Sequence, residues 1–141
     1  MMLSDWRVFA FGSAIFAAFT AIFGKIGVAE INSNLATFIR TIVILLVTAL
    51  IISARKEWQS PSTLDSKSVL FLVLSAFATG GSWLCYYHAL KLGPASKVAP
   101  VDKLSVALAI IMAILFLGEK ASLKTIIGGI LVVAGSVVLA L

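Results

Sequence analysis

The chain has 141 residues, of which 61% are hydrophobic and 12% are charged, and its formal net charge is +5 at pH 7. An ordinary soluble domain has roughly 45–50% apolar and about 25% charged residues, so this composition excludes a water-soluble fold. Several apolar runs approach the ~20 residues that an α-helix needs to cross a bilayer, and several such runs exclude a secretory signal peptide as their explanation. The cations mostly flank these runs, as in membrane topology signals, so no nucleic-acid partner is predicted.

The hydrophobic runs predict one all-α domain over residues 1–141, an integral membrane bundle of five transmembrane helices. The predicted helices cover approximately 6–24, 35–54, 69–90, 98–117 and 122–141. Cys85 is the single cysteine and lies within an apolar run, where a small buried hydrophobe is its common role.

The link after the first helix holds Lys25, followed by Gly27, Glu30 and Asn32. One interpretation is a solvated turn. The other places Lys25 at the mouth of a cavity, because its long aliphatic stem can carry the ammonium group to water or to an anionic group.

The second helix carries Arg40 inside its apolar run. A guanidinium group there is costly unless it reaches the interface, meets a partner or faces water, so an intramembrane arginine is a candidate functional residue. Snorkelling to the interface and a role in a binding site are both open for Arg40.

The polar segment 55–67 separates the second and third helices, and Ser66 or Ser68 is predicted to cap the third. Trp83 and Tyr87 lie four residues apart in that helix and therefore share one face. Tyr87 can belong to an aromatic belt with Tyr86 and His88 at the membrane surface, or, with Trp83, line a cavity.

The segment 92–105 combines two prolines with Asp102 and Lys103 at the entrance of the fourth apolar run. Pro100 fits the first turn of a helix, where its missing N–H is harmless, but would bend a helix that begins one turn earlier. Adjacent residues on a helix point about 100° apart, so Asp102 and Lys103 need not pair. They are either a charged helix end at the interface or part of a cavity.

The fifth helix carries Gly128 and Gly135 two turns apart on one stripe. Small residues in such a stripe let two membrane helices approach closely, which predicts packing against another helix.

Catalysis finds little support in the residue pattern. His88 has no neighbouring serine or cysteine nucleophile, and the acidic residues are scattered singly. The chain also has no glycine-rich phosphate loop and no metal-ligand spacing, so neither an enzyme, a metal site nor a cofactor is predicted.

Several short motifs together resemble an EamA domain of the drug/metabolite transporter superfamily. They are Gly93-Pro94-Ala95, Ala99-Pro100-Val101, Phe116-Leu117-Gly118-Glu119 and the run Gly128 to Gly135. The segments 23–27 and 34–41 are similar to the opening pattern of its five-helix bacterial and archaeal branch.

The resemblance implies one half of an inverted-repeat transporter fold that pairs with a second, oppositely oriented copy. The glycine stripe of the fifth helix is similar to the dimerising helix of small multidrug resistance relatives. Those relatives carry a proton-binding glutamate in their first helix, which this chain lacks. From the resemblance as a whole we expect an antiparallel homodimer in the cytoplasmic membrane that moves a small polar or amphipathic metabolite by alternating access.

The expected substrate-binding residues have a cationic majority, which favours an anionic or zwitterionic cargo. They are Lys25, Arg40, Trp83, Tyr87, Asp102 and Lys103. Two competing hypotheses are a heteromeric or non-transporting membrane subunit, such as half of a lipid-linked sugar flippase, and a structural membrane anchor.

Overall fold

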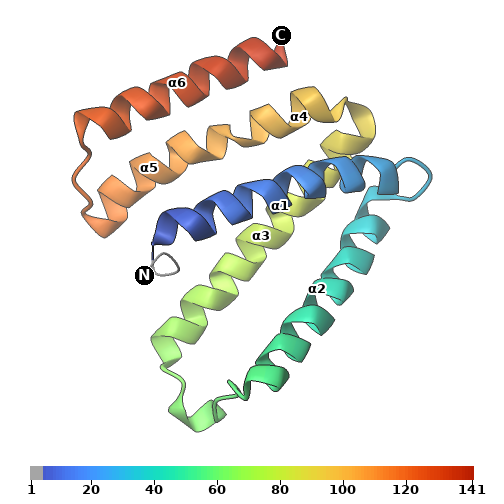
Figure 1. Cartoon of the computed structure of the whole chain (residues 1–141), viewed down its shortest axis with the longest axis vertical. Helices are drawn as coiled ribbons and strands as arrows, with labels where there is room; N and C mark the ends of the chain where they lie inside the picture. The colour runs from blue at the N-terminus through green and yellow to red at the C-terminus, as the bar shows by residue number, and fades with distance from the viewer. Residues whose placement is uncertain (1–4) are drawn as a thin grey trace. The chain divides into compact units, whose positions relative to one another are not determined.

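The computed structural model describes residues 5–141, and this part of the chain consists of helices joined by short loops (Figure 1). The helices are α1 (Trp6–Gly27), α2 (Ser33–Arg55), the 3-10 turn η2 (Pro61–Thr63), α3 (Ser66–Leu92), α4 (Ala95–Asp102), α5 (Leu104–Leu117) and α6 (Leu123–Ala140). With α4 and α5 taken as one span, Ala95–Leu117, residues 5–141 contain five helical segments that are long and apolar enough to cross a membrane. The predicted all-α membrane fold is confirmed.

The chain divides into two compact units. One contains α1 up to Lys25 together with residues 92–141, and the other contains residues 26–91.

In the second unit, the buried residues gather where α2 begins and α3 ends. Val28 and Leu90 are completely buried, and Ser33, Thr37 and Tyr87 are nearly so. The ammonium group of Lys91 donates a 2.9 Å hydrogen bond to the carbonyl oxygen of Ile31, which ties the end of α3 to the loop before α2. This end of the hairpin is therefore its ordered core.

Helix α3 begins three residues earlier than the sequence predicts, because Asp65 is its cap. The backbone N–H and the hydroxyl of Ser68 each donate to Asp65 Oδ2 at 2.8 Å. The prediction of Ser66 or Ser68 as the cap is wrong, since Ser68 is the donor. These hydrogen bonds lower the pKa of Asp65, the one from the Ser68 backbone N–H most strongly and the one from the Ser68 hydroxyl next. Helix α3 then runs without interruption through Gly80 and Gly81.

In the first unit, α6 packs along both α4 and α5 (Figure 1). Lys97 of α4 donates a 3.0 Å hydrogen bond to the carbonyl oxygen of Leu141, so α4 lies beside the C-terminal half of α6. A Cβ atom on Gly129 would come 3.3 Å from the Cδ1 of Ile110, so the absence of a side chain there permits close contact between α6 and α5.

The fourth span is interrupted at Lys103, between α4 and α5. The helix starts at Ala95, so Pro100 lies inside α4 rather than in its first turn. Proline has no N–H to donate to the carbonyl four residues earlier. Next to it, the N–H of Lys103 bonds to the carbonyl of Pro100 at 3.0 Å, and the N–H of Val106 bonds to that of Lys103 at 3.0 Å. These hydrogen bonds join residues three apart, where a regular α-helix joins residues four apart, and they form the break.

Candidate functional site

The most unusual polar group in residues 26–91 is the guanidinium of Arg40, which lies against two aromatic rings. Its Cζ atom is 3.1 Å from the centroid of the Trp83 ring and 5.5 Å from that of Tyr87. A guanidinium over an aromatic face is attracted by the negative charge of the π-electrons, and the attraction grows when water is removed. Arg40 therefore has partners within the chain.

Helical spacing explains why these three side chains meet. Trp83 and Tyr87 are one turn apart on α3, so both rings face α2. Tyr86 meets the edge of the Tyr87 ring, with their centroids 6.2 Å apart, and Tyr87 itself is only 5% exposed. Tyr87 is therefore packed inside the hairpin, which differs from the alternative of a residue in a surface belt.

One nitrogen of the Arg40 guanidinium has no hydrogen-bond partner. The Nη1 atom is buried and makes no hydrogen bond in the structure. A buried donor without an acceptor costs roughly 1–3 kcal/mol, and more when the group is charged. Guanidinium N–H groups match the oxygens of carboxylates and phosphates, so the cluster has the chemistry to accept an oxyanion.

Other polar side chains lie on α2 on both sides of Arg40 in the chain, and one of them meets α3. Ser33 Oγ lies 3.4 Å from His88 Nδ1, while the hydroxyls of Thr37 and Thr41 donate to backbone carbonyls one turn earlier, at 2.9 and 2.8 Å. From the sequence, His88 was a candidate only for catalysis or for an aromatic belt, so its pairing with Ser33 was not predicted. The position of His88 next to Tyr87 was the available signal.

Lys25 makes a structural contact in the first unit. Its ammonium group donates a 2.9 Å hydrogen bond to the carbonyl oxygen of Gly93, and the residue is half-buried. The bond ties the last turn of α1 to the loop before α4, and a cation there complements the carbonyl-rich end of a helix.

Asp102 and Lys103 form an ion pair in the same unit, with Lys103 Nζ 3.2 Å from Asp102 Oδ2. Their side chains are 35% and 52% exposed. This pair was not expected from the sequence, because neighbouring residues on a regular helix point in different directions. They meet here because the helix is interrupted at Lys103.

The six predicted site residues thus have different surroundings. Arg40, Trp83 and Tyr87 form one cluster, hereafter the Arg40 cluster. Asp102 and Lys103 form a pair, and Lys25 holds a backbone carbonyl.

Comparison with known proteins identifies the class. The model of the EamA-like transporter family matches residues 5–141. An "Uncharacterized transporter in cobO 3'region" from Sinorhizobium sp is 52% identical over 139 residues, covering 99% of each chain. An uncharacterized protein from Methanocaldococcus jannaschii is 32% identical over 77 residues, which cover 55% of this chain and 56% of that protein. No solved structure matches the chain.

The family match spans nearly the whole chain, and its transporter class agrees with five apolar helices and with polar groups placed inside them. Membership also implies a small-molecule substrate and a lipid environment. The chain is a multi-pass membrane protein that belongs to the EamA-like transporter family.

Proposed function

We propose that this protein is a secondary transporter of the cytoplasmic membrane that moves a small anionic or zwitterionic metabolite by alternating access. The observation that carries this proposal is the unpartnered Nη1 of Arg40 inside a membrane-spanning hairpin. Trp83 and Tyr87 hold the guanidinium in place, and a carboxylate or phosphate oxygen of the cargo accepts the free N–H. Lys25, Asp102 and Lys103, which belong to the other unit, are proposed as further substrate-binding residues.

Ligand-induced stabilisation tests the site. Purified protein is heated with candidate carboxylates, phosphates, amino acids, sugars and cations, because a ligand that binds only the folded state raises its apparent stability. We expect an anionic or zwitterionic compound to raise the melting temperature. The increase should disappear in Arg40→Gln and weaken in Arg40→Lys, which keeps the charge but loses the planar donor fork.

Arg55→Gln is the matched control, because Arg55 lies at the end of the same helix, α2. Its side chain is 69% exposed and lies 3.6 Å from Glu57. A compound that stabilises Arg40→Gln as strongly as the unchanged protein would remove Arg40 from the site.

Asp102 is proposed as the proton-responsive or pairing group of the cycle, next to the break in the fourth span at Lys103. Interrupted membrane helices place polar groups at the binding sites of other secondary transporters. In proteoliposomes, Asp102→Asn should abolish any dependence of uptake on a pH gradient. Uptake that remains equally dependent on the gradient would exclude this role.

The antiparallel homodimer is proposed to form through α6. Cβ atoms added to Gly128 and Gly135 would meet nothing within 4 Å, so this glycine stripe is open to a second helix. Reporters active on only one side of the membrane, fused to the C-terminus, should both give signals if both orientations exist. A signal from a single reporter would exclude the antiparallel dimer.

The lone chain in proteoliposomes separates the homodimer from a heteromeric subunit. Uptake by the purified chain, lost in Gly128→Leu, is expected of the homodimer. Activity that appears only with a second short homologue would instead favour the heteromeric assembly.

A further inference from the structure

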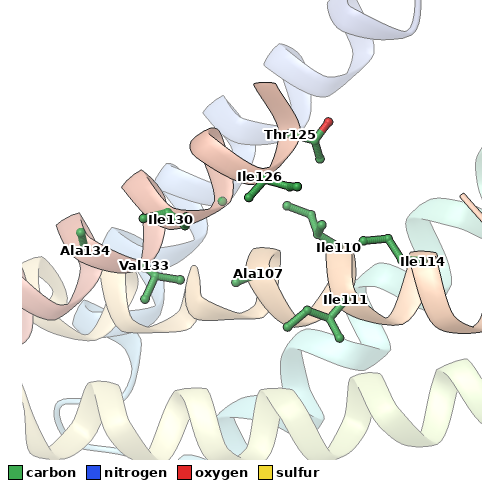
Figure 2. Close-up of a pocket in the computed structure, with 10 residues that line it drawn as sticks. Ala107, Ile110, Ile111, Ile114, Thr125, Ile126, Ile130, Val133 and Ala134 are labelled. Atoms are coloured by element: carbon green, nitrogen blue, oxygen red, sulfur yellow. The ribbon is translucent and has the colours of Figure 1, made fainter. Parts of the chain in front are cut away.

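A second candidate site lies in the first unit, on the side of α6 that faces α5. A groove of about 450 Å³ is lined almost wholly by aliphatic side chains. Figure 2 shows Thr125, Ile126, Ile130 and Ala134 of α6 lying across from Ala107, Ile110 and Ile114 of α5. The groove is separate from the glycine stripe, because Gly128 and Gly135 lie on the opposite side of α6 at 100° per residue.

The length of the groove matches one leaflet of a bilayer. From Thr125 to Ala134 α6 rises by about 13 Å at 1.5 Å per residue. Half of the ~30 Å hydrocarbon core is about 15 Å. Beyond Ala134 the groove ends, in the part of α6 that packs beside α4. A partner helix would need a path along the whole span, whereas an acyl chain needs only this half.

Opposite charges lie beside the Thr125 end of the groove. An adjoining hollow of about 390 Å³ shares Ile110, Ile114 and Thr125 with it and is lined also by Glu119 and Lys120. Among residues 5–141, no ion pair or side-chain hydrogen bond engages either charge. Gly118, in the left-handed conformation with φ of 69°, ends α5 and turns the chain into this segment. The charges thus follow directly after the end of the apolar span Ala95–Leu117.

We propose that this groove binds a phospholipid whose head carries both a phosphate and a primary ammonium group, as in phosphatidylethanolamine. One acyl chain lies between α5 and α6, since an empty apolar groove forfeits dispersion contacts along its walls. The phosphate meets Lys120 and the ammonium meets Glu119. This site is independent of the Arg40 cluster and of the transport cycle.

Native mass spectrometry tests the proposal. The protein is released from nanodiscs containing equal amounts of phosphatidylethanolamine, phosphatidylglycerol and phosphatidylcholine, and the retained lipid is identified. We expect retained phosphatidylethanolamine, and loss of it in Ala107→Phe, which fills the groove. Ala134→Phe fills the same end of the groove from α6 and is the second variant if the first does not fold. Ala76→Phe is the control, because Ala76 is an exposed residue of α3.

Glu119→Gln should lower the preference for phosphatidylethanolamine over phosphatidylglycerol by about two- to fivefold, the change that corresponds to one exposed ion pair. Lys120→Gln should weaken retention of both. Equal retention by Ala107→Phe, Ala134→Phe and the unchanged protein would overturn the proposal, as would the absence of lipid preference. So would disulfide cross-linking between two copies through Ile130→Cys in a Cys85→Ser background, because a second chain would then occupy the groove.

Discussion

The contact between Arg40 and Trp83 gives the sharpest energetic prediction. A double-mutant cycle with Arg40→Met and Trp83→Leu isolates their interaction from the separate costs of each truncation. The guanidinium lies 3.1 Å from the Trp83 centroid and carries a buried Nη1. A partly desolvated cation–π contact with tryptophan contributes about 1–2 kcal/mol, so we expect a coupling energy in this range.

Tyr87 provides an internal comparison. Its centroid is 5.5 Å from Arg40 Cζ, near the ~6 Å limit of a useful cation–π contact, and a phenol ring is a weaker partner than an indole. The cycle with Tyr87→Leu should therefore give a coupling energy of roughly 0.5–1 kcal/mol.

Equilibrium unfolding in mixed detergent micelles, followed by far-ultraviolet circular dichroism, measures both cycles without relying on the fluorescence of the mutated tryptophan. In the absence of denaturant, the variants of both cycles should keep nearly all of the secondary structure of the unchanged protein. A coupling energy near zero for Arg40 with Trp83 would contradict the contacts of the Arg40 cluster. A coupling energy larger with Tyr87 than with Trp83 would also contradict them.

Two further predictions concern helix ends and helix packing. Asp65→Ala should reduce the hydrogen-exchange protection of the Ser68 amide. The pKa of Asp65 is lowered in the folded chain, so its stabilisation of the first turn of α3 is complete above the ordinary pKa of 3.8. That stabilisation is lost only as the pH falls through the lower pKa of the folded chain. In Asp65→Asn this acid dependence of the Ser68 protection factor should vanish. Gly129→Leu should destabilise the chain by about 1–3 kcal/mol in chemical unfolding, since it crowds Ile110. Gly128→Leu, which meets open space, should change the stability of the single chain little; an equal loss would contradict the α5–α6 contact.

The membrane spans could be predicted from the sequence because hydrocarbon permits few alternatives. A run of apolar residues must satisfy its backbone hydrogen bonds internally, and a helix does so. Helix ends were less predictable, since they depend on single side chains. Asp65, Ser66 and Ser68 are all residue types that can cap α3. The geometry of the turn gives the role to Asp65, whose Oδ2 accepts the Ser68 N–H.

The partner of a long side chain is also not encoded in sequence spacing. Lys25 can reach any carbonyl within its length, and the structure gives it the carbonyl of Gly93, far along the chain. Asp102 and Lys103 diverge on a regular helix and pair here because α4 ends at Asp102 and Lys103 lies in the break before α5. Both contacts follow from tertiary structure, which hydrophobic periodicity does not contain.

The Arg40 cluster combines a predictable half with an unpredictable one. The shared face of Trp83 and Tyr87 follows from their spacing. Whether that face meets Arg40 depends on how α2 is oriented about its own axis relative to α3, which the spacing does not give. Aromatic faces offset the positive charge while accepting at most weak hydrogen bonds, so they cannot satisfy a fork of five N–H donors. The free Nη1 thus leaves part of the cost of burying Arg40 uncompensated. An oxyanion that accepted this N–H would remove that cost, so ligand binding and stabilisation of the hairpin are expected to rise together.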